Sequence, residues 1–254
     1  ADCAKFQMRN LESLYHNQGN ANDDREDLGS QYVLDLLSKF QLTPEKMFEL
    51  FDYCKQQAIL PLCTPWDRES LDLLEQYGMD AYKVASADLT NHDFLKHLVA
   101  TKKPLICSTG MSTEEEIKET VTLLKRHGAA YILLQCNSTY PAPFKDINLN
   151  YIKRLKEIGD CPIGYSGHER GIHVPVAAVS MGAKVIEKHL TLDKNMEGND
   201  HKVSLLPKEF KSMITSIREV EQALGEYTER RPSQGELINR EVLAKSLIIN
   251  RNIE

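Results

Sequence analysis

This sequence lacks paired cysteines, a membrane-spanning apolar run and an excess of basic residues. Its six cysteines form no C-x-x-C pair and mostly lie in apolar runs as small hydrophobic residues, which suits a reducing cytosol. No apolar run reaches the ~18 residues of a membrane span, and no basic segment precedes an apolar one at the N-terminus. Lysine and arginine number 31 against 37 aspartates and glutamates, so no basic surface for nucleic acid is expected. We therefore expect a soluble, cytoplasmic protein that binds neither membranes nor nucleic acid.

The sequence does contain a regular alternation of short apolar runs and amphipathic stretches, in a chain of 254 residues that is long enough for one large core. The apolar runs end near Phe6, Cys63, Val84, Ser108, Cys136, Ser166 and His189. After the first long interval, successive ends lie 21 to 30 residues apart, which is typical of a strand-loop-helix-loop unit and predicts a parallel sheet. Seven such units fit an open doubly wound sheet or a (β/α)₈ barrel that lacks one member.

Helix signals separate the apolar runs. Thr43 followed by Pro44 predicts a helix start, Ser112 with Glu115 predicts a capping box, and 207–225 reads as an amphipathic helix between a proline and a glycine. The polar interval 8–42 predicts either a lid or a solvated insertion. The chain opens without methionine and ends on a strand-like segment, which favours a fragment with a sheet domain at 1–230 and a linker at 231–254.

Polar residues follow the ends of the predicted strands, where ligands gather in parallel α/β folds. They are Lys5, Gln7, Thr64, Lys83, Ser86, Asp88, Ser108, Ser138, Tyr140, Ser166, His168, Glu187 and His189. Lys5 and Lys83 each end an apolar strand, so they either pair with a nearby acid or receive an anion such as a phosphate or carboxylate. Trp66 is assigned to core packing, and Cys136 receives no role because no histidine accompanies it in the pattern.

Two consecutive strands each finish on an imidazole, at His168 and His189. A single histidine is more often a hydrogen-bonded core residue, but a pair on neighbouring strand ends favours a shared metal ion. Glu187, Asp200 and His201 accompany them in the sequence. Two nitrogens completed by oxygen ligands fit Mn²⁺ or Mg²⁺ better than closed tetrahedral zinc.

The motifs "AKFQ", "YKVASAD", "KPLICSTGMST", "QCNSTYPAP", "IGYSGHERG", "GAKVIEKHLTLDK" and "GNDHKVSL" together resemble the sialic acid synthase (N-acetylneuraminate synthase) family over nearly the whole chain. The resemblance implies a (β/α)₈ TIM barrel, incomplete at its N-terminus, and a homodimer when the protein is full length. It also implies a metal-dependent condensation of phosphoenolpyruvate with an N-acylated amino sugar, usually N-acetylmannosamine, to give a nonulosonic acid and phosphate.

The resemblance also implies roles for individual residues. Positions around phosphoenolpyruvate are Lys5, Thr64, Lys83, Ser86, Ser108, Ser138, Tyr140 and Ser166. Gln7, Asp88 and Asp200 match positions that face the amino sugar, and His168 with His189 matches the Mn²⁺ ligands. We assign catalysis to Lys5, Lys83, Tyr140 and Glu187: the lysines neutralise the anion, and Glu187 orients a water or a ligand.

The sequence departs from the family pattern in ways that leave the product open. A first-strand glutamate and a C-terminal antifreeze-like domain with a sugar-binding arginine are expected in the family and are not found in this chain, so we expect it to be catalytically incomplete. Asp88 stands where many relatives have glutamate, so the product could be N-acetylneuraminic, legionaminic or pseudaminic acid. The alternatives are another phosphoenolpyruvate-dependent 3-deoxy sugar acid synthase and a non-catalytic anion-binding module.

Overall fold

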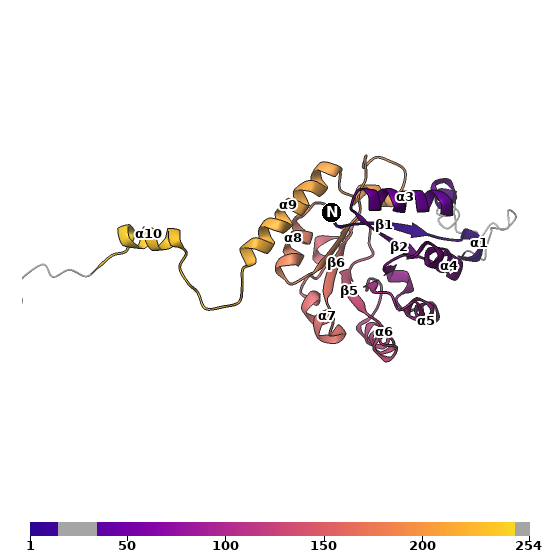
Figure 1. Cartoon of the computed structure of the whole chain (residues 1–254), viewed down its shortest axis with the longest axis horizontal. Coiled ribbons are helices and arrows are strands. Elements are labelled where there is room, and N and C mark those ends of the chain that lie inside the picture. Colours follow the sequence, from indigo (N-terminus) through magenta and orange to yellow (C-terminus); the bar gives the residue numbers. More distant parts are fainter. Residues whose placement is uncertain (15–34, 247–254) are drawn as a thin grey trace, which may run out of the picture.

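Seven parallel strands form one sheet in chain order in the computed structural model, which describes residues 1–14 and 35–246. The strands are β1 Cys3–Met8, β2 Leu60–Pro65, β3 Tyr82–Val84, β4 Leu105–Ser108, β5 Tyr131–Cys136, β6 Ile163–Gly167 and β7 Val185–Lys188. The sheet curls (Figure 1), so that Lys5 Nζ on β1 lies 3.6 Å from Glu187 Oε1 on β7. Within the described ranges no hydrogen-bonded ladder joins β7 to β1. The predicted incomplete TIM barrel is therefore confirmed over the open doubly wound sheet.

Helices cover the outside of the curled sheet (Figure 1). The longer ones are α3 Pro44–Gln56, α4 Arg68–Tyr77, α5 His92–Ala100, α6 Glu114–Arg126, α7 Tyr151–Gly159, α8 His173–Ser180, α9 Pro207–Leu224 and α10 Gln234–Leu243. Shorter ones are α1 Leu11–Leu14, a helix at 35–40, and the 3₁₀ turns η1 Ser86–Asp88, η2 Phe144–Asp146 and η3 Asn199–Lys202. Most of the predicted lid or insertion at 8–42 lies outside the described residues. No described helix is long and apolar enough to cross a membrane.

The helix boundaries follow local hydrogen-bonding rules. The Thr43 side chain caps α3 and Pro44 occupies its first turn, as predicted. The capping box of α6 lies one residue later than predicted: Thr113, and not Ser112, accepts from the Glu116 amide, while the Glu116 carboxylate accepts from the Thr113 amide at 2.7 Å. Either register satisfies the sequence pattern, and only the backbone selects between them.

Strand alternation determines which side chains face the helices and which face the barrel interior. On β3, Tyr82 and Val84 are buried in the core between sheet and helices, so Lys83 between them points to the opposite face. On β6, Ile163 and Tyr165 join the same core. The intervening positions are therefore directed into the barrel interior, toward the site.

The C-terminal part of the described chain leaves the barrel after α9. This helix packs on α8 through a separate cluster that contains Val179, Met213 and Ile217. The residues of α10 are exposed, and Figure 1 shows this helix apart from the barrel. The division into a barrel domain at 1–230 and a linker at 231–254 stays a prediction.

Candidate active site

One cavity of about 290 Å³ opens at the carboxyl ends of the strands, where a parallel barrel places its ligands. Nearly all of the side chains singled out in the sequence line it: Lys5, Gln7, Thr64, Lys83, Ser86, Ser108, Ser138, Tyr140, Ser166, His168, Glu187, His189 and Asp200. The structure thus brings together residues from all seven strands or the loops that follow them.

Asp88 is the predicted site residue that does not line the cavity. It is 9% exposed at the end of η1, where Asn91 Nδ2 donates to its Oδ1 at 3.2 Å. Its Oδ2 is buried without a hydrogen-bond partner among the described residues. Burial raises the pKa of this carboxyl above its ordinary value. A sugar contact of Asp88 therefore stays a prediction that the cavity walls do not support.

Two lysines from different strands flank one glutamate inside the cavity. Glu187 lies 3.6 Å from Lys5 Nζ and 3.7 Å from Lys83 Nζ. The Lys83 side chain is only 4% exposed, and its ammonium donates to Ser108 Oγ at 2.6 Å and to the Val84 carbonyl at 3.0 Å. The two ammonium groups thus converge on one carboxylate inside the cavity, and Glu187 balances part of their charge.

The charges of Lys5, Lys83 and Glu187 shift the pKa values of Lys83 and Glu187. Burial by itself raises the pKa of Glu187, but the ammonium groups of Lys83 and Lys5 outweigh it and hold this pKa below its ordinary value. Burial lowers the pKa of Lys83, and the Glu187 charge opposes that shift. Glu187 is therefore ionised near neutral pH, where it can accept hydrogen bonds or orient a water molecule.

Gly110 leaves room for two hydroxyls of the cavity. A Cβ at this position would lie 2.3 Å from Ser138 Oγ and 2.8 Å from Ser86 Oγ. We expect Gly110→Ala to displace both hydroxyls and to weaken phosphoenolpyruvate binding by about tenfold to 100-fold, measured by calorimetric titration. Gly235→Ala in α10 is the control, because no atom lies within 4 Å of a Cβ at position 235. The affinity of this variant for phosphoenolpyruvate should match that of the parent. Unchanged affinity in Gly110→Ala would contradict a role for these hydroxyls.

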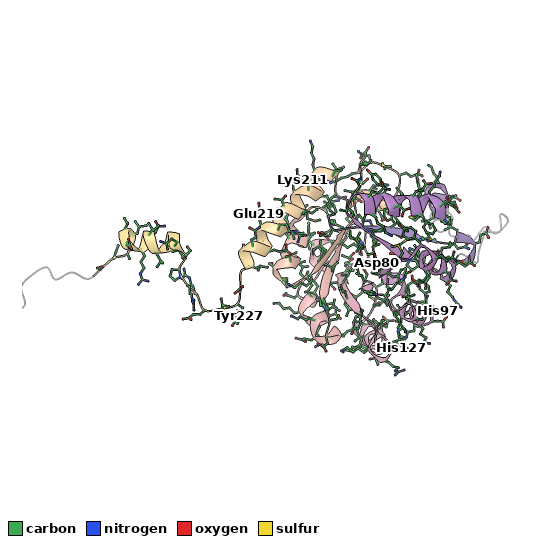
Figure 2. All side chains as sticks on the ribbon, in the orientation of Figure 1. Asp80, His97, His127, Lys211, Glu219 and Tyr227 are labelled. Atoms are coloured by element: carbon green, nitrogen blue, oxygen red, sulfur yellow. The ribbon has the colours of Figure 1, made fainter. Side chains whose placement is uncertain are left out.

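The two imidazoles lie beside each other in the cavity lining. The ring centroids of His168 and His189 lie 5.3 Å apart at an interplanar angle of 44°. That spacing allows one nitrogen of each ring to lie about 2.1 Å from a shared ion. Figure 2 places His97 and His127 on the outer helical layer, away from this pair.

The hydrogen bonds of His168 determine which of its nitrogens is available. His168 Nδ1 lies 2.6 Å from the Asn137 carbonyl, which can only accept, so Nδ1 carries the hydrogen. Nε2 is therefore the basic nitrogen, and the Tyr140 hydroxyl donates to it at 3.1 Å. Metal-binding histidines commonly donate their other ring nitrogen to a carbonyl or carboxylate in this way.

Asp200 lies near His189 without a hydrogen bond to it. The distance from His189 Nδ1 to Asp200 Oδ2 is 3.7 Å, which is too long for a hydrogen bond. Burial, the largest cause, lowers the pKa of His189 to about 4, so this imidazole is neutral at physiological pH. For His168, burial lowers the pKa, but Cys136, the Asn137 carbonyl and Glu187 outweigh it and leave the pKa above its usual value.

The donor set fits a divalent ion that takes two nitrogens and several oxygens. No three His, Cys, Asp or Glu side chains in the described part of the chain form a ready-made metal cluster. The chain would therefore supply His168 and His189, while water or substrate oxygens would complete the shell. Such open, oxygen-rich coordination suits Mn²⁺ or Mg²⁺ rather than structural zinc.

Three cavity residues were missed or given another role in the sequence analysis. Arg9 lies at the rim with its guanidinium 4.3 Å from the Trp66 ring, and Trp66 Nε1 donates to Gln7 Oε1 at 3.0 Å. Trp66 was assigned to core packing, yet it lines the cavity. Cys136 Sγ lies 3.8 Å from His168 Nδ1, a contact across neighbouring strands that linear spacing does not reveal. Arg9 shares the strand face of Lys5 and Gln7, which was the available signal.

A curled parallel barrel that gathers two lysines, several hydroxyls and two imidazoles at its carboxyl edge defines an enzyme acting on a small anionic substrate. A family model described as the NeuB family matches residues 1–229. N,N'-diacetyllegionaminic acid synthase of Campylobacter jejuni is 40% identical over 266 residues, which cover 100% of this chain and 77% of that enzyme. Human N-acetylneuraminate-9-phosphate synthase is 34% identical, over 98% of this chain and 69% of that enzyme.

The solved structure of the N-acetylneuraminic acid (sialic acid) synthetase of Leptospira borgpetersenii, in complex with citrate, has a TM-score of 0.83 to this chain. It is 30% identical and the match covers 97% of this chain and 83% of that one. The chain belongs to the NeuB family. The resemblance to the sialic acid synthases is confirmed, and the chain is an enzyme of this synthase class.

Proposed function

We propose that the enzyme to which this chain belongs catalyses the metal-dependent condensation of phosphoenolpyruvate with an N-acylated amino sugar. The C3 carbon of phosphoenolpyruvate forms a bond to the aldehyde carbon of the open-chain sugar, whose oxygen takes up a proton. Water adds to C2, and the bond from C2 to the phosphate oxygen then breaks. The products are a nonulosonic acid and inorganic phosphate.

The observation that carries this proposal is that two lysines and two histidines line one cavity. Lys5 and Lys83 converge on Glu187. The imidazoles of His168 and His189 lie 5.3 Å apart by ring centroids. Phosphoenolpyruvate has two anionic groups, a phosphate and a carboxylate, and two ammonium groups with serine hydroxyls match that charge pattern. The amino sugar would bind beside it, toward the rim where Gln7 lies.

The chain's own residues have distinct tasks in this reaction. Lys83 and Lys5 hold the anionic reactant and neutralise charge on the departing phosphate. Glu187, held ionised by these lysines, accepts a hydrogen bond from the water that adds at C2. Tyr140 donates its hydroxyl hydrogen, now directed at His168 Nε2, to a reactant oxygen. A divalent ion bound by the two histidines would supply Lewis-acid polarisation of the sugar aldehyde.

The test is phosphate release by the enzyme with phosphoenolpyruvate, Mn²⁺ and one candidate sugar at a time. We expect release only with an N-acylated amino sugar and only before metal removal with a chelator. The panel contains N-acetylmannosamine, the 2,4-diacetamido sugars that lead to legionaminic and pseudaminic acid, and a phosphorylated aldose. Release with the phosphorylated aldose alone would assign the chain to the 3-deoxy sugar acid synthases. Tight phosphoenolpyruvate binding without release in every mixture would support a binding module instead.

Two properties inferred from the sequence belong to this proposal. The enzyme would act as a homodimer when full length, for which sedimentation equilibrium should give twice the mass of one full-length polypeptide. It would act in the cytoplasm, because both proposed substrates are small polar molecules and neither requires an enzyme at a membrane. A monomer at micromolar concentration would contradict the first of these.

A further inference from the structure

A buried ion pair lies directly behind the two imidazoles, on the side of the strands that faces the helices. Lys188 Nζ is 2.8 Å from Glu169 Oε1, and both side chains are 0% exposed. Tyr165 donates its hydroxyl hydrogen to Glu169 Oε2 at 2.5 Å, and Lys188 also donates to the Glu169 backbone carbonyl. The carboxylate and the ammonium group are therefore satisfied by each other and by their immediate surroundings.

The chain positions of this pair relate it to the site. Glu169 directly follows His168, and Lys188 lies between Glu187 and His189. In the β6–β7 ladder, Gly167 is in register with Lys188. The pair thus ties the backbone that carries one imidazole to the backbone that carries the other.

Gly167 supplies the space that the carboxylate needs. A Cβ at this position would lie 2.7 Å from Glu169 Oε2 and 2.8 Å from its Oε1. Such contacts are far shorter than carbon and oxygen atoms tolerate. The end of β6 is therefore shaped around the Glu169 side chain.

Stability alone is a poor reason for burying two charges. Desolvation of a carboxylate and an ammonium group offsets most of their attraction, and apolar replacements of similar volume are often equally stable. Orientation of the metal ligands explains the buried pair better than stability does. The groups around a metal site must hold its ligands in place to within a fraction of an ångström. A rigid, fully buried link between the two histidine-bearing segments meets that need.

We propose that Glu169 and Lys188 are positioning residues that hold His168 and His189 at the separation a divalent ion requires. The inference rests on the proposed function, because it assumes that the two imidazoles bind the ion. Neither residue touches a reactant: their side chains lie outside the cavity lining. They act through the residues next to them in the chain.

The test measures the Mn²⁺ affinity of the double variant Glu169→Gln, Lys188→Met. The electron paramagnetic resonance signal of free Mn²⁺ reports how much of the ion is bound. The two replacements remove both charges together and keep similar volumes, so neither partner is left as an unpaired buried charge. We expect the Mn²⁺ dissociation constant to rise by about 10-fold to 100-fold. The melting temperature should stay close to that of the parent.

A second Tyr–Glu–Lys trio, whose ion pair is partly exposed, provides a control. Tyr82 donates to Glu75, and Lys103 Nζ lies 2.6 Å from Glu75 Oε1, where α4 meets the beginnings of β3 and β4. These three side chains do not line the cavity. The variant Glu75→Gln, Lys103→Met should therefore bind Mn²⁺ as the parent does.

The outcomes distinguish the positioning role of Glu169 and Lys188 from the proposed function of the enzyme. A parent that binds Mn²⁺ and a Glu169→Gln, Lys188→Met variant that binds it equally well would overturn the positioning role and leave the proposed function intact. A loss of Mn²⁺ affinity that parallels a large fall in melting temperature would also overturn it, by assigning the pair to stability. A parent that binds no Mn²⁺ would overturn this inference together with the metal part of the proposed function.

Discussion

Replacing His189 by alanine is expected to abolish Mn²⁺-dependent phosphate release from phosphoenolpyruvate and the amino sugar. The two imidazoles lie 5.3 Å apart by ring centroids and are the nitrogen donors that the chain offers to one ion. Because a single ligand would remain, the loss in kcat/KM should reach at least about 1000-fold, or ~4 kcal/mol of transition-state stabilisation. His168→Ala should have the same effect. Continuous phosphate detection with and without Mn²⁺ measures both.

His127→Ala is the matched control for these variants. His127 is exposed after α6, lies on the outer helical layer in Figure 2 and does not line the cavity, so its loss should leave turnover unchanged. Circular dichroism would establish that each alanine variant is folded. Parent-like turnover in folded His168→Ala or His189→Ala would remove the metal assignment.

Lys83→Met is expected to weaken phosphoenolpyruvate binding by about 100-fold, or ~2.7 kcal/mol. The ammonium group of Lys83 is nearly buried, and it reaches Ser108 Oγ at 2.6 Å from the base of the cavity. Methionine fills a similar volume without a charge, so the change removes the cation while the barrel wall keeps its packing. Calorimetric titration of phosphoenolpyruvate without sugar measures this loss separately from chemistry.

An exposed lysine on α7 allows a matched comparison. Lys153→Met removes the same charge from the molecule at a residue outside the cavity lining, and the affinity of this variant for phosphoenolpyruvate should stay at the parent value. If Lys83→Met bound phosphoenolpyruvate within threefold of the parent, the anion would have to be held elsewhere. In that case Arg9 at the cavity rim would be the next cation to replace.

The fold was predictable because its signals are local and repeated. The apolar run that ends at Ser108 and the one that ends at Cys136 coincide with the ends of β4 and β5. Their even spacing already implies parallel strands with crossovers. The capping box of α6 was misplaced by one residue, since Ser112 and Thr113 are chemically similar and only the backbone distinguishes them.

Much of the site was predictable for the same reason. In a parallel sheet the strand ends meet at one edge, so residues such as Lys83 and His168 must lie near one another once the strands are recognised. Asp88 is the exception: it follows its strand by four residues, and the 3₁₀ turn η1 directs it away from the cavity lining. Several residues beyond a strand end, alternation no longer determines where a side chain points.

The sequence by itself determined the class of fold, the family and the edge of the sheet at which ligands bind, because periodicity and strand order are properties of the linear chain. The tertiary structure alone decided which groups touch: that Glu187 lies between Lys5 and Lys83, and that Glu169 and Lys188 are sealed behind the imidazoles. These contacts join segments up to 182 residues apart, counted from Lys5 to Glu187. They depend on the curl of the sheet and on the burial of each side chain, which no local pattern encodes.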